Sequence, residues 1–304
     1  MKAIVTGGAG FIGSWVSDLL ITKGHEVAVI DNLTTGNKEN VNPKAKFYEI
    51  DILGKKISEI FQIEKPDYVF HLAAQINVRE SIRNPSQDAT QNIVGTLNVL
   101  GQCVKNNVKK VIFSSSSGAY GSEVKIPTSE NQIPDPESPY GIAKLSIEKY
   151  LNFFKKVHGL DYVALRYGNV YGPRQNSKGE AGVIAIFVNK SLNGEKLTIF
   201  GDGEQTRDYV YVKDVAKANL AAINLSGIFN VGTNTETSVN QIVSKINEIT
   251  NMQCDKEHTS GIKGEIRRSV LDYSKLEKNG WSPKYSFGEG LKETIDYFKD
   301  LRPN

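Results

Sequence analysis

The sequence predicts an α/β fold, a doubly wound parallel sheet followed by a smaller α+β region. Two observations predict it. Short apolar segments rich in β-branched residues alternate with longer segments of helical spacing through the first half of the chain, as expected for a parallel sheet covered by helices on both faces. Beyond about residue 175 the strand-like segments become scarcer and the connecting segments longer.

Five segments are expected to be buried strands of the main sheet, because each is short, apolar and rich in β-branched or aromatic residues. They are residues 3–5, 27–30, 68–70, 111–113 and 162–165. We expect a first domain at residues 1–175 and a substrate-binding region at 176–304, with an approximate boundary and some chain crossing. The second region has expected strands at 197–200 and 228–231 and expected helices near 214–225, 239–250 and 290–299.

The composition is that of an ordinary folded protein. Of the 304 residues, 39% are hydrophobic, and 37 Lys and Arg stand against 34 Asp and Glu. The charges are interleaved along the chain, so neither a nucleic-acid partner nor a membrane partner is expected. The two cysteines, Cys103 and Cys254, cannot build a disulfide framework. The longest apolar runs, such as 183–188, are far shorter than the ~18 residues that span a bilayer. We therefore expect a soluble cytoplasmic protein without a signal peptide.

A glycine-rich segment follows the first strand and begins the first helix. Residues 6–13 have the sequence T-G-G-A-G-F-I-G, which matches G-x-G-x-x-G through Gly8, Gly10 and Gly13, and G-x-x-G-x-x-G through Gly7, Gly10 and Gly13. Glycine lets the backbone turn tightly and approach a pyrophosphate, which then lies at the helix N-terminus. The alternative is an ordinary glycine-rich turn, but the flanking strand and helix favour a Rossmann-type dinucleotide site.

Asp31 ends the second strand, where a carboxylate can accept the hydroxyl groups of a ribose. A carboxylate at this place repels a 2′-phosphate, and the first arginine of the chain is Arg79. The alternative is a polar surface turn at Asp31 and Asn32. The spacing favours a cofactor site, and NAD over NADP.

Tyr140 and Lys144 lie four residues apart in a segment, 138–144, that begins a helix, so they share one face. A phenol has a pKa of ~10, and both the lysine cation and a positive nicotinamide ring favour the phenolate. Alone, such a pair is usually a helix-surface pair, and the serines at 114–117 alone could be a polar loop. Ligands of α/β sheets bind at the carboxyl ends of the strands, where these residues and the glycine loop converge.

The chain resembles the extended short-chain dehydrogenase/reductases, the NAD-dependent epimerase/dehydratase family, and most closely its UDP-glucose (UDP-galactose) 4-epimerases. The resemblance covers essentially the whole chain. It is carried by 6–13, Asp31-Asn32, Asp51-Ile52, 71–74, 114–121, 138–144, 165–172 and 201–214, which includes Arg207-Asp208-Tyr209.

The resemblance implies a reversible C4 epimerisation of a UDP-sugar through a transient 4-keto intermediate, with tightly bound NAD. Ser116, Tyr140 and Lys144 match the family's catalytic residues. The implied cofactor residues are Gly7, Gly10, Phe11, Ile12, Gly13, Asp31, Asn32, Thr35, Gly36, Asp51, Ile52, Leu72, Ala73, Ala74, Asn92, Ser114, Tyr140, Lys144 and Tyr167. The implied substrate residues are Ser116, Tyr140, Asn169, Arg207 and Ser269, with Arg207 at a phosphate.

Other activities of this fold stay open. Nucleotide-sugar 4,6-dehydratases and decarboxylases carry acidic residues after the catalytic Ser or Thr, whereas this chain has Ser117 and Gly118. A uronic acid 4-epimerase, a dehydrogenase or reductase that releases NADH, and a non-enzymatic NAD-sensing regulator are further alternatives. The Tyr140 and Lys144 pair weighs against the regulator.

The likeness is weakest near residue 262. Where the family often has Arg-x-Gly-Asp, this chain has Ile262-Lys263-Gly264-Glu265, so a diphosphate arginine is missing unless Lys263, Arg267 or Arg268 replaces it. In the same alignment, Ser269 falls beside the sugar's 2-substituent, and its small side chain leaves room for an N-acetyl group.

Two expectations concern assembly and metals. Helical segments 85–105 and 140–155 carry apolar residues on more than one side, and the family resemblance implies a homodimer packed through them. The four histidines, His25, His71, His158 and His258, lack metal-ligand spacing, so no metal is expected, and His71 is expected to be a hydrogen-bonded core residue.

Overall fold

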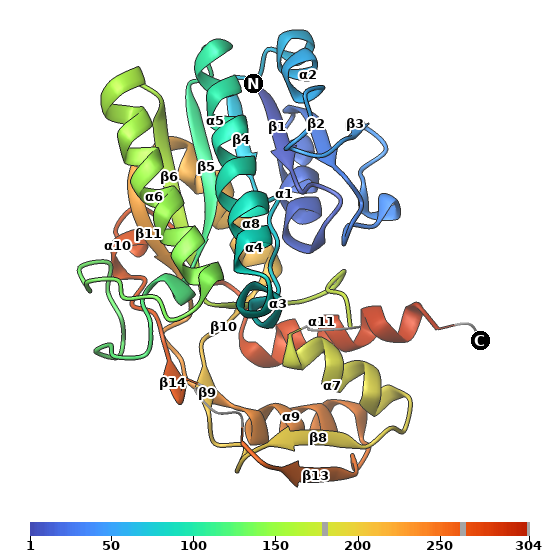
Figure 1. Cartoon of the computed structure of the whole chain (residues 1–304). Coiled ribbons are helices and arrows are strands. Elements are labelled where there is room, and N and C mark those ends of the chain that lie inside the picture. Colours follow the sequence, from blue (N-terminus) through green and yellow to red (C-terminus); the bar gives the residue numbers. More distant parts are fainter. Residues whose placement is uncertain (178–181, 262–265, 303–304) are drawn as a thin grey trace.

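A seven-stranded parallel sheet forms the centre of the protein (Figure 1). The structure is a computed structural model that describes residues 1–177, 182–261 and 266–302. The strand order is β11-β6-β5-β4-β1-β2-β3, so the order reverses beside β1, where α/β sheets bind their ligands. The strands are β1 (Lys2–Thr6), β2 (Glu26–Asp31), β3 (Lys46–Glu49), β4 (Tyr68–His71), β5 (Lys110–Ser116), β6 (Asp161–Tyr167) and β11 (Gly227–Val231).

Helices cover both faces of this sheet. One face packs against α2 (Ile57–Glu64), α5 (Gly95–Lys105) and α6 (Pro139–His158), and the other against α1 (Phe11–Thr22) and α8 (Val212–Ala221). The strands β1, β2, β4, β5 and β6 bury side chains on both faces, which is why the predicted segments are continuously apolar. The shorter elements of this part are η1 (Lys38–Asn40), α3 (Val78–Arg83), α4 (Pro85–Ala89), the π-helical turn η2 (Thr90–Val94), η3 (Ser117–Ala119), η4 (Ala222–Asn224) and α10 (Ser274–Glu277).

The start of α6 is defined by local sequence. Ser138 is the N-cap, and its hydroxyl accepts a hydrogen bond from the Gly141 backbone at 3.1 Å. Pro139 occupies the first turn, where no intrahelical N–H donor is needed. The helix ends at Gly159, which adopts φ +71° and so provides the left-handed C-cap that an L side chain disfavours. These signals place Tyr140 in the first turn of the helix, at the carboxyl edge of the sheet.

A smaller part lies below the carboxyl ends of the strands in Figure 1. It has its own apolar core, in which α7, α9 and α11 pack together. Its small sheets have the orders β10-β7, β12-β9-β14 and β13-β8. Its elements are β7 (Asn169–Tyr171), α7 (Val183–Leu192), β8 (Leu197–Phe200), β9 (Thr206–Arg207), β10 (Tyr209–Tyr211), β12 (Thr237–Ser238), α9 (Val239–Thr250), β13 (Lys256–Thr259), β14 (Arg268–Ser269) and α11 (Phe287–Asp300).

The predicted fold class is confirmed, and all five predicted strands lie in the main sheet. One expected element lies in the other part of the molecule. The strand expected at 228–231 in the C-terminal region is β11, which pairs with β6 in the main sheet, and α8 packs against α1. Residues 212–231 therefore return to the first part of the molecule after the boundary expected near 175. Within the described ranges, the helices are too short or too polar to cross a membrane.

Candidate active site

Most of the predicted cofactor and catalytic residues lie at the carboxyl edge of the sheet. They lie at the ends of β2, β5 and β6, in the segments that follow β1, β2, β3 and β4, and in the first two turns of α1 and α6. Parallel strands end at the same edge, so residues from distant parts of the sequence meet there.

The glycine loop leaves no room for side chains. Gly7 adopts φ +68°, and a Cβ on it would lie 2.7 Å from the Ala73 backbone nitrogen. A Cβ on Gly13 would lie 2.1 Å from the Gly7 carbonyl oxygen. Gly10 caps α1 without a side-chain hydrogen bond, and the first turn, which begins with Phe11 and Ile12, carries no acidic residue. The N-terminus of this helix is therefore suited to a pyrophosphate, and the close approach of Ala73 brings the β4 loop beside it.

Asp31 is held by backbone donors. Its two carboxylate oxygens accept hydrogen bonds from the Ala9 backbone at 3.0 Å and from the Leu33 backbone at 2.9 Å. A Cβ on Gly36 would lie 2.8 Å from the Asp31 Oδ1 atom, so the following loop folds over the carboxylate. Thr35, in that loop, is exposed. Asp31 thus stands, in a fixed orientation, between the glycine loop and the segment after β2.

Asp51 is a second acidic residue near Asp31. The Asn32 amide donates to Asp51 Oδ2 at 2.8 Å, while Asp51 Oδ1 accepts from the Leu53 backbone at 2.8 Å. Ile52 is buried in the core layer under α2 and α5. These contacts join the segments that follow β2 and β3 into one wall.

Asn92 organises the loop that follows β4. Its side chain accepts from the Gln75 backbone nitrogen at 2.8 Å and donates to the Gln75 carbonyl at 3.0 Å. It also donates to Asp88 Oδ1 at 3.0 Å. Leu72, Ala73 and Ala74, which precede Gln75, are thereby held above the sheet edge. The second oxygen of Asp88, Oδ2, is buried without a hydrogen-bond partner among the described residues, and burial raises the pKa of Asp88.

Ser116, Tyr140 and Lys144 are brought together. The Tyr140 and Ser116 side chains are hydrogen-bonded, and Ser116 Oγ accepts from the Gly118 backbone at 3.1 Å. Lys144 is 2% exposed, and its Nζ atom donates to the Ser114 carbonyl at 2.7 Å. The same ammonium lies 5.6 Å from the centre of the Tyr140 ring. The three side chains predicted from sequence therefore form one cluster between α6 and the end of β5.

Burial dominates the electrostatics of this cluster. It raises the pKa of Tyr140 to about 12, against the effect of the Ser116 hydrogen bond, and it lowers the pKa of Lys144 to about 8, against the nearby Asp88 and Glu148 carboxylates. The sequence predicted a lowered pKa for Tyr140 beside a lysine cation and a nicotinamide. In the chain alone, desolvation of the phenolate outweighs the favourable neighbours.

Ser114 and Tyr167, two further predicted cofactor residues, contact different neighbours. The Ser114 carbonyl, rather than its hydroxyl, contacts Lys144. Tyr167 is buried, and its hydroxyl is hydrogen-bonded to Asn219 of α8, with the Asn219 amide nitrogen at 2.8 Å. Burial raises the pKa of Tyr167. Tyr167 therefore packs at the edge of the site with its hydroxyl directed to the opposite face of the sheet.

The predicted substrate residues lie on the small sheets. Arg207 on β9 and Ser269 on β14 are paired directly, and Thr237 on β12 pairs with Arg207 from the other side. Arg207 Nη1 donates to the Thr206 carbonyl at 2.8 Å. Asn169, at the start of β7, is exposed, and its backbone donates to the Asp208 carbonyl at 2.7 Å.

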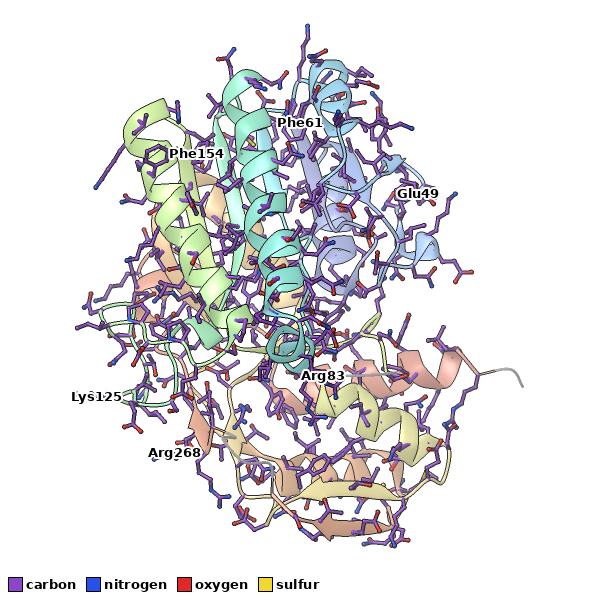
Figure 2. The ribbon with its side chains drawn as sticks, viewed as in Figure 1. Glu49, Phe61, Arg83, Lys125, Phe154 and Arg268 are labelled. Atoms are coloured by element: carbon purple, nitrogen blue, oxygen red, sulfur yellow. The ribbon has the colours of Figure 1, made fainter. Side chains whose placement is uncertain are left out.

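The two described cations suggested as substitutes for the missing arginine have carboxylate partners. Arg267 contacts both carboxylate oxygens of Asp202, at 2.8 and 2.7 Å. Arg268, labelled in Figure 2 on the outer edge of the smaller part, pairs with Glu236, with its Nε atom at 2.9 Å. Ile262, Lys263, Gly264 and Glu265 lie outside the described residues. A depression of about 360 Å³ next to β14 is lined by Ser122, Glu123, Ile126, Glu137, Ile266, Arg267 and Arg268.

His71 is the core residue that the sequence predicted. Its ring nitrogens lie 2.7 Å from Thr6 Oγ1 and 2.8 Å from Thr96 Oγ1, and burial lowers its pKa to about 3. The described residues contain no group of three or more His, Cys, Asp or Glu side chains arranged to hold a metal ion.

Sequence reasoning missed three buried charged residues near the catalytic cluster: Asp88, Glu148 and Arg166. Each is 2% exposed or less. The one available signal was spacing, since Glu148 follows Lys144 by four residues and so shares its helix face.

The comparisons with known proteins agree with this geometry. Residues 3–232 match the model of the NAD dependent epimerase/dehydratase family. The chain is similar to the UDP-glucose 4-epimerase of Thermotoga maritima, solved with UDP-glucose, with 52% identity, a TM-score of 0.97 and 99% of each chain covered. It is also similar to the Thermus thermophilus UDP-glucose 4-epimerase, solved with NAD, with 41% identity, a TM-score of 0.94, and 99% of this chain and 100% of that one covered.

A third similar structure is the UDP-N-acetylglucosamine 4-epimerase of Methanobrevibacter ruminantium, in complex with UDP-N-acetylmuramic acid, with 39% identity, a TM-score of 0.95 and 99% of each chain covered. These likenesses extend over nearly the whole chain, as the sequence motifs indicated. The protein is thus a member of the NAD dependent epimerase/dehydratase family.

Proposed function

We propose that this protein is an NAD-dependent UDP-sugar 4-epimerase, which interconverts UDP-galactose and UDP-glucose through a transient 4-keto sugar. The observation that carries the proposal is the cluster of Ser116, Tyr140 and Lys144, which lies at the carboxyl edge of the sheet together with the glycine loop. Similar proteins over nearly the full chain carry the name UDP-glucose 4-epimerase.

The described residues fit NAD. A Cβ on Gly7 or Gly13 would clash with the backbone of Ala73 or Gly7, so these glycines let the loop turn tightly. The N-terminus of α1 has no side-chain cap, so a pyrophosphate can approach it. Asp31 presents a carboxylate for the ribose hydroxyls, and Asn32, Thr35, Gly36, Asp51 and Ile52 surround the adenosine end. Leu72, Ala73, Ala74, Asn92, Ser114 and Tyr167 would line the nicotinamide end. When bound, the cofactor would supply reversible hydride transfer at C4 of the sugar.

The proton chemistry belongs to the chain. The Tyr140 oxygen takes the proton of the sugar 4-hydroxyl and later returns it. Ser116, already hydrogen-bonded to Tyr140, holds the same sugar oxygen. The Lys144 ammonium would stabilise the Tyr140 phenolate and would hold the nicotinamide ribose. Burial raises the pKa of Tyr140 to about 12, and the positive charge of a bound nicotinamide would act in the opposite direction.

The sugar nucleotide is placed on the β12-β9-β14 sheet. Arg207 grips the diphosphate, because a guanidinium matches phosphate oxygens in a bidentate manner. Asn169 contacts the sugar nucleotide from β7, and Ser269, the direct partner of Arg207, lies beside the 2-substituent. The diphosphate tether allows the 4-keto sugar to turn over before the hydride returns.

The alternatives are less well supported. Dehydration or decarboxylation on this fold uses a carboxylate directly after the catalytic serine, and the corresponding residues here are Ser117 and Gly118 in η3. A uronic acid 4-epimerase is the alternative that the substrate test decides, because a relative 32% identical over 312 residues is named UDP-glucuronate 4-epimerase.

We further propose a homodimer that packs through α5 and α6. One side of α6 exposes Ile142, Tyr150, Phe153 and Val157 to between 40% and 59% of their surface. Their spacings of eight, three and four residues place them along one helical stripe, on a different face of the helix from the buried Ile147 and Leu151. Phe154, labelled in Figure 2, marks the outer end of this helix. A contiguous exposed apolar stripe of this kind is typical of a protein interface.

Both cysteines are buried and unpaired, which is in keeping with a cytoplasmic enzyme.

The test is direct. The purified protein, loaded with NAD, is mixed with UDP-galactose, and the products are separated. Formation of UDP-glucose, approaching the same mixture from either sugar, supports the proposal. Turnover of UDP-glucuronate alone would transfer the proposal to the uronic acid pair, and formation of a 4-keto-6-deoxy sugar would reject epimerisation.

A further inference from the structure

A buried ion pair lies directly behind the catalytic cluster. Glu148 on α6 and Arg166 on β6 are each 2% exposed. The Arg166 Nε atom lies 2.9 Å from Glu148 Oε1, and Nη2 lies 2.6 Å from Oε2. Ser115, also 2% exposed, donates from its hydroxyl to Glu148 Oε1 at 2.6 Å. Glu148 therefore accepts three hydrogen bonds from side chains of two neighbouring strands.

The Glu148–Arg166 pair lies where the packing between α6 and the sheet changes from apolar to charged. On the face of β5 and β6 that α6 covers, the residues farther from the site are apolar, among them Val111, Phe113 and Ala164. Ser115 and Arg166 are direct partners in the last part of the ladder, next to the pair of Ser116 with Tyr167. The interface thus changes from apolar to charged one step before the catalytic serine.

Stability does not explain this change. Removing two charges from water costs free energy that their attraction repays only when the geometry is good, and apolar residues of similar size are often as stable or more so. Such a pair fixes geometry, whereas apolar packing tolerates small shifts of a helix along a sheet. The bidentate contact between Arg166 and Glu148 specifies the position of α6 relative to the ends of β5 and β6.

The catalytic residues depend on that position. Tyr140, Lys144 and Glu148 follow one another at intervals of four residues and share one face of α6. Tyr140 must meet Ser116, and Lys144 must meet the Ser114 carbonyl, both on β5. Ser115, between those two residues, is the one that binds Glu148. Three consecutive residues of β5 are therefore matched to three successive turns of α6.

Arg166 is itself held in place. Its guanidinium carbon lies 4.4 Å from the centre of the Tyr120 ring, and the Tyr120 hydroxyl donates to Asn230 on β11 at 2.7 Å. The pair is thus connected to β5, β6, β11 and the segment after Ser116.

We infer that Glu148 and Arg166, together with Ser115, are positioning residues, which hold Tyr140 and Lys144 in register with Ser114 and Ser116 for proton and hydride transfer. This inference rests on the proposed 4-epimerase function. It assigns the three residues no contact with the substrate or with NAD.

The test compares three variants with the NAD-loaded wild type. Ser115→Ala removes one hydrogen bond and keeps the ion pair. The double variant Glu148→Gln with Arg166→Gln removes both charges together, so that no unpaired charge stays buried. Ser191→Ala is the control, because Ser191 is a buried serine of α7 whose hydroxyl accepts from Cys254 Sγ, in the smaller part of the molecule. For each protein we would measure kcat, KM, NAD content, melting temperature and the isotope effect with UDP-galactose deuterated at C4.

We expect kcat to fall by roughly 10-fold in Ser115→Ala and by about 100-fold in the double variant, as for other small misplacements of reacting groups. KM and NAD content are expected to change little. The isotope effect is expected to rise, because hydride transfer becomes rate-limiting. Ser191→Ala is expected to keep the wild-type values.

Two results would overturn the inference. One is a wild-type kcat and isotope effect in Ser115→Ala. The other is a loss of activity that follows the lost NAD or the lost folded protein in every variant, with an unchanged isotope effect. If the double variant does not fold, Ser115→Ala decides by itself. Failure of the wild-type protein to interconvert the two sugars would instead reject the proposed function, and is seen before any variant is made.

Discussion

Arg207 and Ser269 are direct partners on the parallel strands β9 and β14. The guanidinium proposed to hold the diphosphate and the small side chain proposed to face the sugar are therefore neighbours on one small sheet. A second contact fixes this pairing, since Glu236 accepts from the Thr206 hydroxyl at 2.6 Å and from Arg268 Nε at 2.9 Å. In the proposed function, the width of the substrate pocket and the anchoring of the substrate would both depend on these short strands.

The first prediction follows from that arrangement. Ser269→Tyr is expected to lower kcat/KM for UDP-N-acetylgalactosamine and UDP-N-acetylglucosamine far more than for UDP-galactose and UDP-glucose, because the larger ring fills the space of the N-acetyl group. In the wild type both pairs are expected to be substrates. The measurement is kcat/KM for all four sugars. Equal loss for both pairs, or no loss for either, would mean that Ser269 does not set the width of the pocket.

The second prediction concerns the base. Tyr140→Phe keeps the ring and removes the oxygen that accepts the proton, so kcat is expected to fall by roughly 10²–10⁴-fold. NAD is expected to stay bound, since the residues proposed for the pyrophosphate and the adenosine lie on other elements. Single-turnover kinetics and the NAD content of the purified variant are the measurements. A variant with near-normal kcat would reject Tyr140 as the base.

The third prediction concerns pH. Burial lowers the pKa of Lys144 to about 8, so the ammonium that supports the Tyr140 phenolate is lost as the pH rises through that value, and kcat is expected to fall there. For stability the sign is the reverse. Lys144 in the unfolded chain binds its proton up to ~10.4, so between about pH 8 and that value the unfolded state binds more protons, and this lysine's contribution to the free energy of unfolding rises with pH.

The check is a pair of pH series, one of kcat and one of denaturant unfolding. Lys144→Met is the matched variant, because it keeps a flexible apolar stem and has no ammonium. The free energy of unfolding of Lys144→Met is expected to lack the rise with pH that the wild type shows. A wild-type kcat that stays flat to pH 10 would contradict the role given to the charge of Lys144.

The fourth prediction concerns assembly. Phe153 and Val157 are 48% and 59% exposed on α6, so a double substitution to Glu is expected to change a dimer into a monomer without unfolding the protein. Light scattering at micromolar concentration is the measurement, with Met252→Glu as the control, because Met252 is 42% exposed after α9, in the smaller part of the molecule and away from the proposed interface. A wild-type protein that is already monomeric would reject the homodimer.

Local patterns predicted most of the fold, because its central strands are buried on both faces and leave a continuous apolar signal. The edge strand β3, with the sequence K-F-Y-E, was missed because its side chains are at most partly buried and the segment is short. The place of β11 beside β6 could not be predicted, because about 60 residues separate the paired strands, and local sequence does not encode such a pairing.

In the candidate site, too, some residues could be predicted from local motifs, and others depend on the tertiary fold. The glycine loop and the spacing of Tyr140 and Lys144 are local motifs, and the Lys144 ammonium lies 5.6 Å from the centre of the Tyr140 ring. Asp88, Glu148 and Arg166 are single charged residues whose environment depends on the tertiary fold. Glu148 was visible as a helix neighbour of Lys144, yet its burial against Arg166 required the register of α6 on β6.

In the proposed function, NAD is reduced and reoxidised within each turnover. The measurement that tests it most directly follows absorbance at 340 nm while UDP-galactose is converted by the NAD-loaded protein, with the UDP-glucose formed in the same sample quantified. We predict many equivalents of UDP-glucose per protein and no growth of absorbance beyond the amount of bound cofactor. Steady growth at 340 nm, one NADH for each sugar consumed, would contradict the account and identify a dehydrogenase.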